Sequence, residues 1–589
     1  MARAATAHAR PASAAHPATR VENIDVARIL EEIADLLEIQ GENPFRIRAY
    51  RTASRTIDTL TVPAASLAGE DRLDELPGIG ADLAGKIRTI LETGTLPLLR
   101  ALTAKTPESL VQMLRIPGLG PKRAKKIYDE LDITTLTDLE TAAKSGRLRE
   151  LPGIKAVTEQ KILHGIAALR GHAARWRLDE ADAYVRPLVA HLQASPAVSR
   201  LEVAGSYRRR KDTVGDVDIL VASSRPRTVV KRFTTYDRVK QVQADGPTRS
   251  SVVLDCGLQV DIRVVPAVSF GSALHYLTGS KSHNIAIRTL GLKHGLTVNE
   301  YGAFRRTRRI AGRTEQEVFD AVGLPWIAPE LREAHGEIEA ARDGRLPRLI
   351  EMSDIRGDLQ AHTNATDGVN DLAEMVEAAR HCKYEYIAIT DHTKAVRVAG
   401  GLTRAGFHRQ FTAIERLQKR HTDITILKGA EVDILDDGQL DLDDAILAEL
   451  DVVVVAVHSK FNLSRTAMTK RIVRALRHPH VHILGHPSGR LIGRREPYQV
   501  DFAEILRAAA DHGVALEINA QPERLDLDDI QARAAHEAGV RLVINTDAHR
   551  VEELTCMRYG VDQARRGWCE PRHVLNTLPI AMLRSAMRP

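Results

Sequence analysis

The sequence is poor in cysteine and has no long hydrophobic run. Its 589 residues include only four cysteines, none in a Cys-x-x-Cys pair: Cys256, Cys382, Cys556 and Cys569. This usage fits a reducing compartment and argues against a zinc site made of cysteine. No apolar run approaches the ~18 residues that would span a bilayer. Residues 1–20 are rich in alanine and lack the apolar segment of a signal peptide, so we expect a disordered tail.

Composition otherwise indicates an ordinary globular protein. Hydrophobic residues make up 43% of the chain and charged residues 27%, and the length predicts about four domains. The excess of Lys and Arg lies in residues 1–350, whereas the rest is slightly acidic and holds most of the histidines. A basic half suits a polyanionic partner, and an acidic, His-rich half suits metal ions. Two domains with ordinary solvated surfaces would give the same balance.

A glycine-containing pattern recurs three times in the N-terminal part. The copies are LPGIGADLAGKI (76–87), IPGLGPKRAKKI (116–127) and LPGIKAVTEQKI (151–162). Each predicts a tight turn before a helix, where backbone N–H groups can bind a phosphate without reading a base. A single copy could equally be a structural helical hairpin, but the repeat favours nucleic-acid binding. The candidate DNA-binding residues are Gly78, Gly80, Lys86, Gly118, Gly120 and Lys122; Lys155 replaces the second glycine of the third copy.

Two aspartates on one predicted strand form the strongest signal of the middle region. Asp216 and Asp218 lie two residues apart in GDVDIL, so a strand places them on the same face. Asp261, in VDIRVV on a later predicted strand, could complete a cluster. Three adjacent carboxylates repel one another unless cations neutralise them, so we predict two Mg²⁺ ions that bind a triphosphate and activate a 3′-hydroxyl. A lone Asp-x-Asp is more often a solvated strand end.

The last 235 or so residues alternate short apolar strands with helices, which predicts a parallel sheet with helices outside, closed as a barrel. Metal-ligating residue types follow these strands. Because strand C-termini meet at one mouth of a barrel, these side chains predict a cluster that binds Zn²⁺, Mn²⁺ or Fe²⁺. One such histidine alone would more often be structural. The motifs are DLQAH (358–362) with Asp367, TDH (390–392), GAEVD (429–433), VHS (457–459), GHP (485–487) and NTDAH (545–549).

The glycine hairpins resemble helix-hairpin-helix motifs, and residues 21–335 resemble the X-family DNA polymerases, the group of DNA polymerase beta. The resemblance implies that Asp216, Asp218 and Asp261 bind the catalytic metals. It also places Lys86 where the family has a lysine that forms a Schiff base in a lyase reaction. Asp82 would raise the pKa of Lys86, so that phosphate binding is the simpler role for this lysine. The implied nucleotide and template contacts are Gly205, Ser206, Arg209, Arg263, Tyr276, Leu277, Gly279, Asn284 and Arg288.

Residues 354–585 resemble the PHP (polymerase and histidinol phosphatase) family, which binds three metals through nine residues. Glu431 would bridge two metals, and His458 is taken as a catalytic residue. Gln360 replaces the first histidine of the usual His-x-His motif, and an amide is a weaker, neutral ligand. The implied ligands are Gln360, His362, Asp367, His392, Glu431, His458, His486, Asp547 and His549.

The whole chain thus resembles bacterial PolX-type polymerases. The expected fold is multidomain, with all-α helix-hairpin-helix domains, an α+β nucleotidyltransferase palm and thumb, and an α/β PHP domain shaped as a distorted TIM-like barrel. The expected limits are an N-terminal helical domain (21–95), a fingers-type domain (96–170), a palm (171–268), a thumb (269–335), a linker (336–353) and the PHP domain (354–589).

The expected function is gap filling in DNA repair, by a polymerase with Mg²⁺ at its active site. The PHP domain, with up to three Mn²⁺ or Zn²⁺ ions, would act as a 3′–5′ exonuclease, and an abasic-site endonuclease is the other activity that the resemblance offers. Expected partners are gapped or nicked duplex DNA and deoxynucleoside triphosphates, with no membrane, for a monomer in the bacterial cytoplasm, at the nucleoid. Alternatives are a DNA-binding phosphoesterase without polymerase activity, a polymerase with a structural PHP domain, and a nucleotidyltransferase for a small molecule.

Overall fold

The computed structural model describes three continuous stretches of the chain and scattered residues between the second and the third. Residues 23–58, 64–106 and 175–587 are continuous; between 107 and 174 the described residues are 110, 113–114, 116, 119–133, 135–151, 154, 158–159, 162–163 and 166. The chain forms two compact units, residues 1–174 and 175–589, and each is considered by itself. The predicted tail, Gly118 and Lys155 lie outside the described residues. Among the described helices, none combines the length and hydropathy needed to cross a membrane.

The described part of the first unit consists of short helices around two cores. The predicted helical period of residues 26–37 is the buried face of the first helix, whose apolar side chains are almost fully inaccessible. The first core lies among α1 (Asn23–Ile39), α2 (Pro44–Asp58), α3 (Ala64–Gly69), η1 (Leu73–Glu75), α4 (Ala81–Thr93) and α5 (Pro97–Lys105). The second involves α7 (Pro121–Leu131), α8 (Leu136–Lys144) and η2 (Arg147–Glu150).

The second unit begins with the palm, a five-stranded sheet in the order β2-β4-β7-β6-β5. Only β4 and β7 run parallel, and this pairing sets the register of the aspartates. Apolar residues of α10 (Leu178–Gln193) and α12 (Pro226–Thr234) cover one face. The strands are β2 (Arg200–Val203), β4 (Asp216–Ala222), β5 (Val239–Asp245), β6 (Arg249–Leu254) and β7 (Gln259–Val265), with a small pair β1 (Trp176–Arg177) and β3 (Thr213–Val214) beside them.

The thumb combines helices with a three-stranded antiparallel sheet. Its first helix also packs on the palm through Phe270, Ala273 and Leu274. Residues 336–353, predicted as a linker, include a helix whose Ile338 and Ala341 are buried in the thumb core. The elements are η3 (Ala267–Ser269), α13 (Phe270–Thr278), α14 (Lys281–Lys293), β8 (Thr297–Asn299), β9 (Gly302–Arg305), β10 (Arg308–Ala311), α15 (Glu315–Ala321), η4 (Pro329–Leu331) and α16 (Glu337–Arg342).

The C-terminal part is the predicted parallel barrel, nearly closed. Seven parallel strands follow one another in sequence order, and a parallel bridge between Ala361 and Ala548 links the first strand to the segment after the last. The strands are β11 (Gly357–Ala361), β12 (Tyr386–Ile389), β13 (Thr425–Asp433), β14 (Val452–Ala456), β15 (Ile483–Leu484), β16 (Ala515–Asn519) and β17 (Leu542–Asn545).

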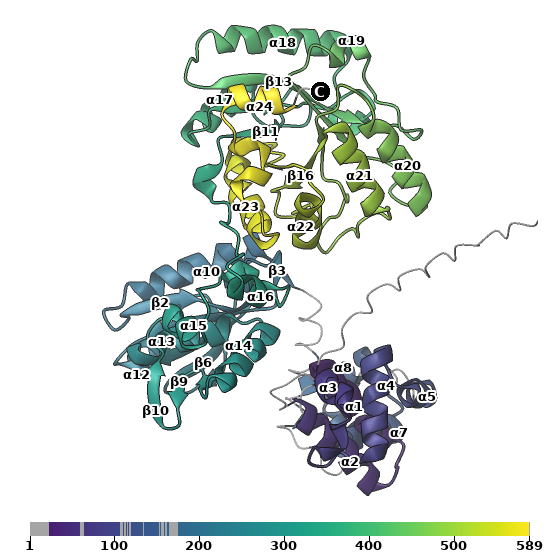
Figure 1. Cartoon of the computed structure of the whole chain (residues 1–589), viewed down its shortest axis with the longest axis vertical. Coiled ribbons are helices and arrows are strands. Elements are labelled where there is room, and N and C mark those ends of the chain that lie inside the picture. The colour runs from purple at the N-terminus through teal and green to yellow at the C-terminus, as the bar shows by residue number, and fades with distance from the viewer. Residues whose placement is uncertain are drawn as a thin grey trace, which may run out of the picture. The chain divides into compact units, whose positions relative to one another are not determined.

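Helices surround this barrel (Figure 1). Its inside is packed with apolar side chains. Leu583 and Met587 of the last helix belong to the inner core, so the helix covers one end of the barrel and leaves the other to the strand C-termini. The helices are α17 (Leu372–His381), α18 (Arg404–Gln418), α19 (Asp444–Leu447), α20 (Arg465–Leu476), α21 (Phe502–His512), α22 (Asp529–Glu537), α23 (Met557–Arg566) and α24 (Ile580–Met587).

The predicted polymerase part and the barrel of this unit share their cores. Leu525 and Tyr559, from the barrel side, are buried in the palm core, and Trp568 is buried in the thumb core. Figure 1 shows α22 and α23 on the side of the barrel next to α16 and β3. The two parts therefore pack against each other through large apolar side chains.

Candidate nucleic-acid and metal sites

The first glycine hairpin has the backbone that its sequence predicts. Gly78 has a φ of +77°, and a Cβ at this position would lie 2.5 Å from Cγ2 of Thr52. Gly80 is the extended N-cap of α4, and a Cβ at Gly80 would meet no atom within 4 Å. The first N–H groups of α4 therefore meet an open approach. Gly120 caps α7 in the same way, and the nearby side chain of Lys122 is 87% exposed.

The side chain of Lys86 is engaged within the first hairpin. Its Nζ lies 2.5 Å from Oδ2 of Asp82 and 5.3 Å from the centre of the Tyr50 ring. Burial by itself lowers the pKa of Lys86, but hydrogen bonds with Asp82 and Tyr50 outweigh it, so that the net shift is upward. The predicted effect of Asp82 is confirmed. A Schiff-base lysine needs the opposite shift, so the direction of this shift argues against the lyase role for Lys86.

The palm brings the three aspartates to one edge of the sheet. Asp218 on β4 stands directly opposite Asp261 on β7, and Asp216 precedes it by two residues on the same face. Burial, together with the charges of Asp216 and Asp261, raises the pKa of Asp218 to about 7, against the opposite effect of Arg263 and Arg249. Mutual repulsion of this kind is what bound cations relieve, so the residues fit a Mg²⁺ site.

A glycine turn approaches this acidic edge. Gly205 has a φ of +64°, and a Cβ there would come within 2.8 Å of Oδ2 of Asp218. The short helix α11 (Gly205–Arg208) starts at this glycine and carries Ser206. Arg263, from β7, faces Glu300 at 3.7 Å. Glycine is required because any side chain would collide with the carboxylate that the site needs.

The two arginines at the end of α11, Arg208 and Arg209, are paired inside the protein. Arg208 donates both terminal nitrogens to Glu315 at 2.8 Å. Arg209 donates Nε to Oε1 of Glu333 at 2.9 Å and Nη1 to the carbonyl of Thr278 at 2.5 Å. A Cβ on Gly279 would lie 3.3 Å from Nη1 of Arg209, so these two predicted nucleotide contacts are neighbours. Nε and Nη1 of Arg209 are thus both engaged inside the protein.

The remaining predicted nucleotide contacts lie where α13 meets α14. Tyr276 is 38% exposed, next to the partly exposed Leu277. Asn284 donates its amide to the carbonyl of Tyr276 at 2.7 Å, while its Oδ1 accepts no hydrogen bond from any described residue. Arg288 is exposed one turn further along α14. The free amide oxygen and the exposed guanidinium are suitable for base and backbone contacts.

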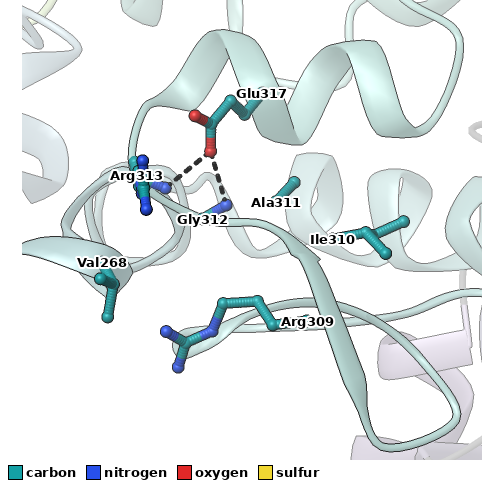
Figure 2. Close-up of a pocket in the computed structure, with 7 residues that line it drawn as sticks. All are labelled: Val268, Arg309, Ile310, Ala311, Gly312, Arg313 and Glu317. Atoms are coloured by element: carbon teal, nitrogen blue, oxygen red, sulfur yellow. Dashed lines mark hydrogen bonds between the residues drawn. The ribbon is translucent and has the colours of Figure 1, made fainter.

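Further along the thumb, β9 and β10 form a hairpin rich in arginine. Arg305 and Arg308 are cross-strand partners, and both are exposed. A pocket of about 330 Å³ opens beside the hairpin and is lined by Arg309, Arg313 and Glu317 together with apolar residues (Figure 2). The carboxylate of Glu317 is used by the backbone N–H groups of Gly312 and Arg313 at 3.0 and 2.9 Å.

At the mouth of the barrel, the predicted PHP ligands converge around Glu431. Its Oε1 lies 3.1 Å from Nε2 of His458 and 2.9 Å from Nε2 of His486, and its Oε2 lies 3.3 Å from Nε2 of His362 and 3.4 Å from Nδ1 of His392. A carboxylate so placed can bridge two metal ions. The charges of His392 and His458 hold its pKa well below the usual range despite burial, which acts in the opposite direction.

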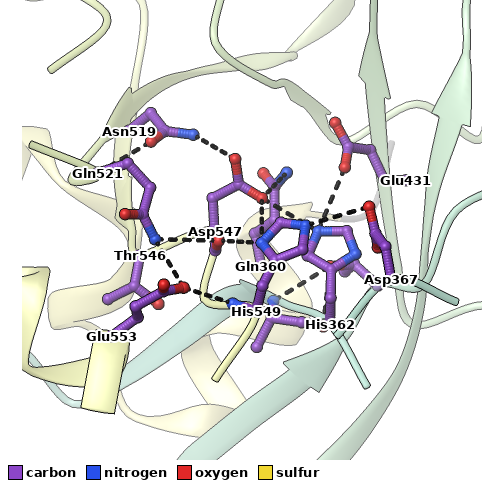
Figure 3. A network of polar contacts seen from close by, with 12 residues as sticks. Gln360, His362, Asp367, Glu431, Asn519, Gln521, Thr546, Asp547, His549 and Glu553 are labelled. Carbon is purple, nitrogen blue, oxygen red and sulfur yellow. Dashed lines mark hydrogen bonds and ion pairs between the residues drawn. The ribbon is translucent and has the colours of Figure 1, made fainter. Parts of the chain in front are cut away.

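Two more carboxylates complete the cluster (Figure 3). Asp547 approaches His362 at 3.0 Å, and Oδ2 of Asp367 lies 3.5 Å from both His392 and His549. Among the described residues, the palm aspartates form no group of three or more possible metal ligands whose ligand atoms lie within 4.8 Å of one another. Three such groups exist, and all lie at this mouth of the barrel. They are His362, Asp367, His392 and His549; His392, Glu431 and His458; and His362, Glu431 and Asp547.

Gln360 also belongs to this mouth. Its Nε2 donates to Oδ1 of Asp547 at 3.4 Å, and its buried Oε1 has no hydrogen-bond partner among the described residues. Two ligands have left-handed backbones, His486 with a φ of +27° and Asp547 with +52°; such strained residues cluster at functional sites. Imidazoles, carboxylates and one orphaned amide oxygen fit a group of divalent cations.

Several supporting residues were not among the predicted ligands. Asp433 accepts from Nδ1 and from the backbone N–H of His458, both at 3.2 Å, and together with Glu431 it raises the pKa of His458 to about 9 against the effect of burial. Glu517 accepts from the N–H of His486 at 2.7 Å. Asp391 accepts from Thr363 at 2.8 Å. Asp391 and Asp433 lie in the strand-end motifs TDH and GAEVD, which could have indicated them.

Known families match successive parts of the chain. These are a helix-hairpin-helix domain (residues 21–96), a SAM-like helix-hairpin-helix tandem (110–167), the DNA polymerase beta palm (174–252), the DNA polymerase beta thumb (273–333) and the PHP domain (358–521). The predicted resemblances and fold class are thereby confirmed.

Curated relatives cover the chain in part or almost whole. The DNA polymerase/3′-5′ exonuclease PolX of Bacillus subtilis is 38% identical over 94% of this chain and 97% of its own length. DNA polymerase lambda of Rattus norvegicus is 26% identical over 53% of this chain and 56% of its own. A probable phosphatase of Thermoanaerobacter sp. is 30% identical over 32% of this chain and 78% of its own. The chain belongs to the bacterial PolX family, with helix-hairpin-helix domains, a polymerase-beta palm and thumb, and a PHP domain.

Proposed function

We propose that this protein fills short gaps in duplex DNA and trims unusable 3′ ends with its PHP domain. It is an X-family DNA polymerase with a 3′-5′ exonuclease PHP domain, as its likeness to PolX over nearly the full length of both chains supports. The observation that carries the polymerase activity is the pairing of Asp218 with Asp261 on adjacent parallel strands, with Asp216 on the same face.

In the palm, we propose Asp216, Asp218 and Asp261 as the ligands of two Mg²⁺ ions. Bound Mg²⁺ supplies charge neutralisation for the triphosphate and a lower pKa for the primer 3′-hydroxyl. Gly205 and Ser206 would present backbone and hydroxyl groups to the phosphates, and Arg209 would add charge. The raised pKa of Asp218 supports this assignment, since a buried acid among acids is stable as a carboxylate only beside a cation.

In the PHP domain, we propose the nine predicted residues as the ligands of up to three ions, Mn²⁺ or Zn²⁺. Bound metal would activate water and hold the scissile phosphate. The chain itself supplies the orientation: Asp433 fixes the ring of His458, and Glu517 fixes the backbone at His486. Partners of a ligand of this kind set its direction and basicity.

Gapped DNA and deoxynucleoside triphosphates are the proposed substrates. The open N-termini of α4 and α7 would grip the backbone on either side of a gap. The arginine hairpin of the thumb would add a contact, because Arg305 and Arg308 face each other as like charges and neither forms an ion pair with a described carboxylate. Directly opposed like charges destabilise a hairpin, and a phosphate between them removes that cost.

A paired assay on a gapped duplex tests both activities, with and without nucleotides and in Mg²⁺ or Mn²⁺. Asp218→Ala should abolish gap filling and leave Mn²⁺-dependent removal of 3′ nucleotides intact, whereas His458→Ala should do the reverse. Gap filling by neither the parent nor the variants would favour a DNA-binding phosphoesterase. If His458→Ala removes 3′ nucleotides no more slowly than the parent, the result would favour a structural PHP domain. That is the second candidate function, because Gln360 is a neutral and weaker ligand.

A further inference from the structure

The segment after α11 is anchored by the PHP domain as well as by the thumb. Arg566, at the end of α23, donates Nη1 to the backbone carbonyl of Arg209 at 2.9 Å and lies 3.2 Å from Oε1 of Glu333. Its other terminal nitrogen contacts Asp529. The side chain of Arg566 is only 4% exposed. One buried guanidinium of the PHP domain therefore touches both members of the Arg209–Glu333 ion pair.

Glu333 is shared by cations from three directions. Oε1 accepts from Nε of Arg209 at 2.9 Å, faces Arg566 at 3.2 Å and lies 3.9 Å from Nζ of Lys211. Burial raises the pKa of Glu333, but the charges of these three residues lower it overall. Glu333 is thus a charged carboxylate whose partners compete for it, and its hold on Arg209 depends on how strongly Arg566 holds it.

The same guanidinium of Arg209 is the proposed triphosphate contact. A triphosphate can bind Arg209 fully only when Glu333 releases it. Releasing one partner of a buried ion pair is costly because the other charge stays buried and uncompensated. Arg566 removes that cost, since it already contacts Glu333 and remains beside it after Arg209 has turned away.

We propose that Glu333 and Arg566 are positioning residues that set the affinity of the palm for deoxynucleoside triphosphates. Glu333 competes with the triphosphate for Arg209, and Arg566, reaching from the PHP domain, keeps Glu333 neutralised when the nucleotide takes Arg209. The inference rests on the proposed function, in which Arg209 contacts the triphosphate. It gives the PHP domain a role in polymerisation that is independent of its metals.

Steady-state gap filling by the full chain tests this through opposite shifts of KM. Glu333→Gln should lower KM for the nucleotide by about three- to tenfold, because a neutral amide holds Arg209 less firmly. Arg566→Gln should raise KM by a similar factor, because Arg209 is then the nearest cation that neutralises Glu333 and is held more firmly. Arg566→Lys should restore part of the affinity. In the double variant KM should fall well below that of Arg566→Gln, since only the contact of Arg566 with the Arg209 carbonyl is then lost and no charged Glu333 competes for Arg209. The value of kcat should change by less than about twofold.

Arg533→Gln is the matched control for loosening of the interface. Arg533 lies on α22 and donates Nη1 to the carbonyl of His335 at 2.8 Å, while its guanidinium stacks 4.0 Å from the Trp568 ring centre. Its removal weakens the contact between PHP domain and thumb without touching Glu333 or Arg209, so KM should not move. Exonuclease rates should be the same in all variants, and a thermal melt checks that each is folded.

Two results would overturn the inference: an unchanged or raised KM in Glu333→Gln, or equal rises in Arg566→Gln and Arg533→Gln. Damage to folding cannot mimic the expected result, because it does not tighten nucleotide binding. Arg209→Ala separates the two levels. If it raises KM while Glu333→Gln has no effect, the positioning role fails alone. If it leaves KM unchanged, the proposed triphosphate contact fails, and the positioning role fails with it.

Discussion

Gln360 stands at the end of β11 with a buried amide oxygen that no described residue satisfies. An imidazole at this position would be a stronger ligand than an amide. We therefore expect Gln360→His to tighten binding of Mn²⁺ by roughly tenfold and to lower the Mn²⁺ concentration needed for half-maximal exonuclease activity. Titration calorimetry and exonuclease rates against Mn²⁺ concentration measure the two effects.

The control for this change is Gln360→Ala, which removes the oxygen without adding a ligand and should weaken binding. If Gln360→His and Gln360→Ala bind Mn²⁺ equally well, position 360 does not face a metal, and the assignment of Gln360 as a ligand is wrong. Polymerase activity should be the same in both, because residue 360 lies in the barrel and the aspartates lie in the palm.

Asp218 makes the stability of the metal-free palm depend on pH. Its pKa in the folded protein is about 7, raised by burial and by Asp216 and Asp261, whereas in an unfolded chain it is ~3.9. Between these values the folded state binds more protons, so the stability of the metal-free palm falls as pH rises through this window. Asp218→Asn should raise the melting temperature of metal-free protein by a few degrees at pH 8 and leave it unchanged at pH 4. An equal shift at both pH values would contradict this origin.

The candidate metal ligands could be proposed from sequence because they lie at or soon after the ends of short apolar strands. The residues that orient them could not be predicted as readily. Glu517 lies within an apolar strand and acts on His486 of the neighbouring strand, and Arg209 has a carboxylate partner 124 residues away. Such pairs depend on which strands and domains become neighbours, and no local spacing encodes that.

At the scale of elements, the first hairpin separates a structural glycine from an accessible one. Gly78 has a positive φ and no room for a Cβ, so Gly78→Ala should destabilise the helical unit by about 1–3 kcal/mol. Gly80 has a φ of −87° and open space, so Gly80→Ala should cost less than about 0.5 kcal/mol. Urea unfolding of the full chain, followed by circular dichroism, compares the two. Equal losses would show that the turn does not require glycine.

The thumb hairpin predicts a salt effect. Replacing Arg305 and Arg308 by alanine should weaken binding of gapped DNA and reduce the slope of log K against log salt by about 2, one for each phosphate that an arginine no longer neutralises. Fluorescence anisotropy at several salt concentrations measures the slope. Two exposed arginines of the PHP domain give the matched double-alanine control: Arg404, the first residue of α18, and Arg420, two residues after α18 ends. If both pairs change the slope equally, the effect reflects total charge rather than a specific phosphate contact.

At the scale of the molecule, the order of domains was predictable but their docking was not. Helical repeats, alternating strands and strand-end histidines each carry a local pattern. The contact between Arg210 and Asp562, by contrast, joins residues 352 positions apart. The burial of Tyr559 in the palm core depends on how the surfaces of the palm and the barrel fit together. The sequence of residues 336–353 predicts a linker, which its composition allows to be helical, but it does not show that the helix α16 packs into the thumb core.

This shared core predicts how the chain tolerates division. A fragment of residues 175–349 would lack Leu525, Tyr559 and Trp568, which are 2%, 4% and 9% exposed in the whole unit. It would also leave Asp182, hydrogen-bonded to Tyr559 at 3.1 Å, without that partner. Each missing large side chain costs about 2–4 kcal/mol.

We expect the fragment to bind a hydrophobic dye and to melt at least about 10 °C below residues 175–589. The longer fragment should keep Mn²⁺-dependent exonuclease activity. If the short fragment melts at the same temperature as the long one, the palm and thumb fold without the barrel. The interface with the barrel then adds nothing to their stability.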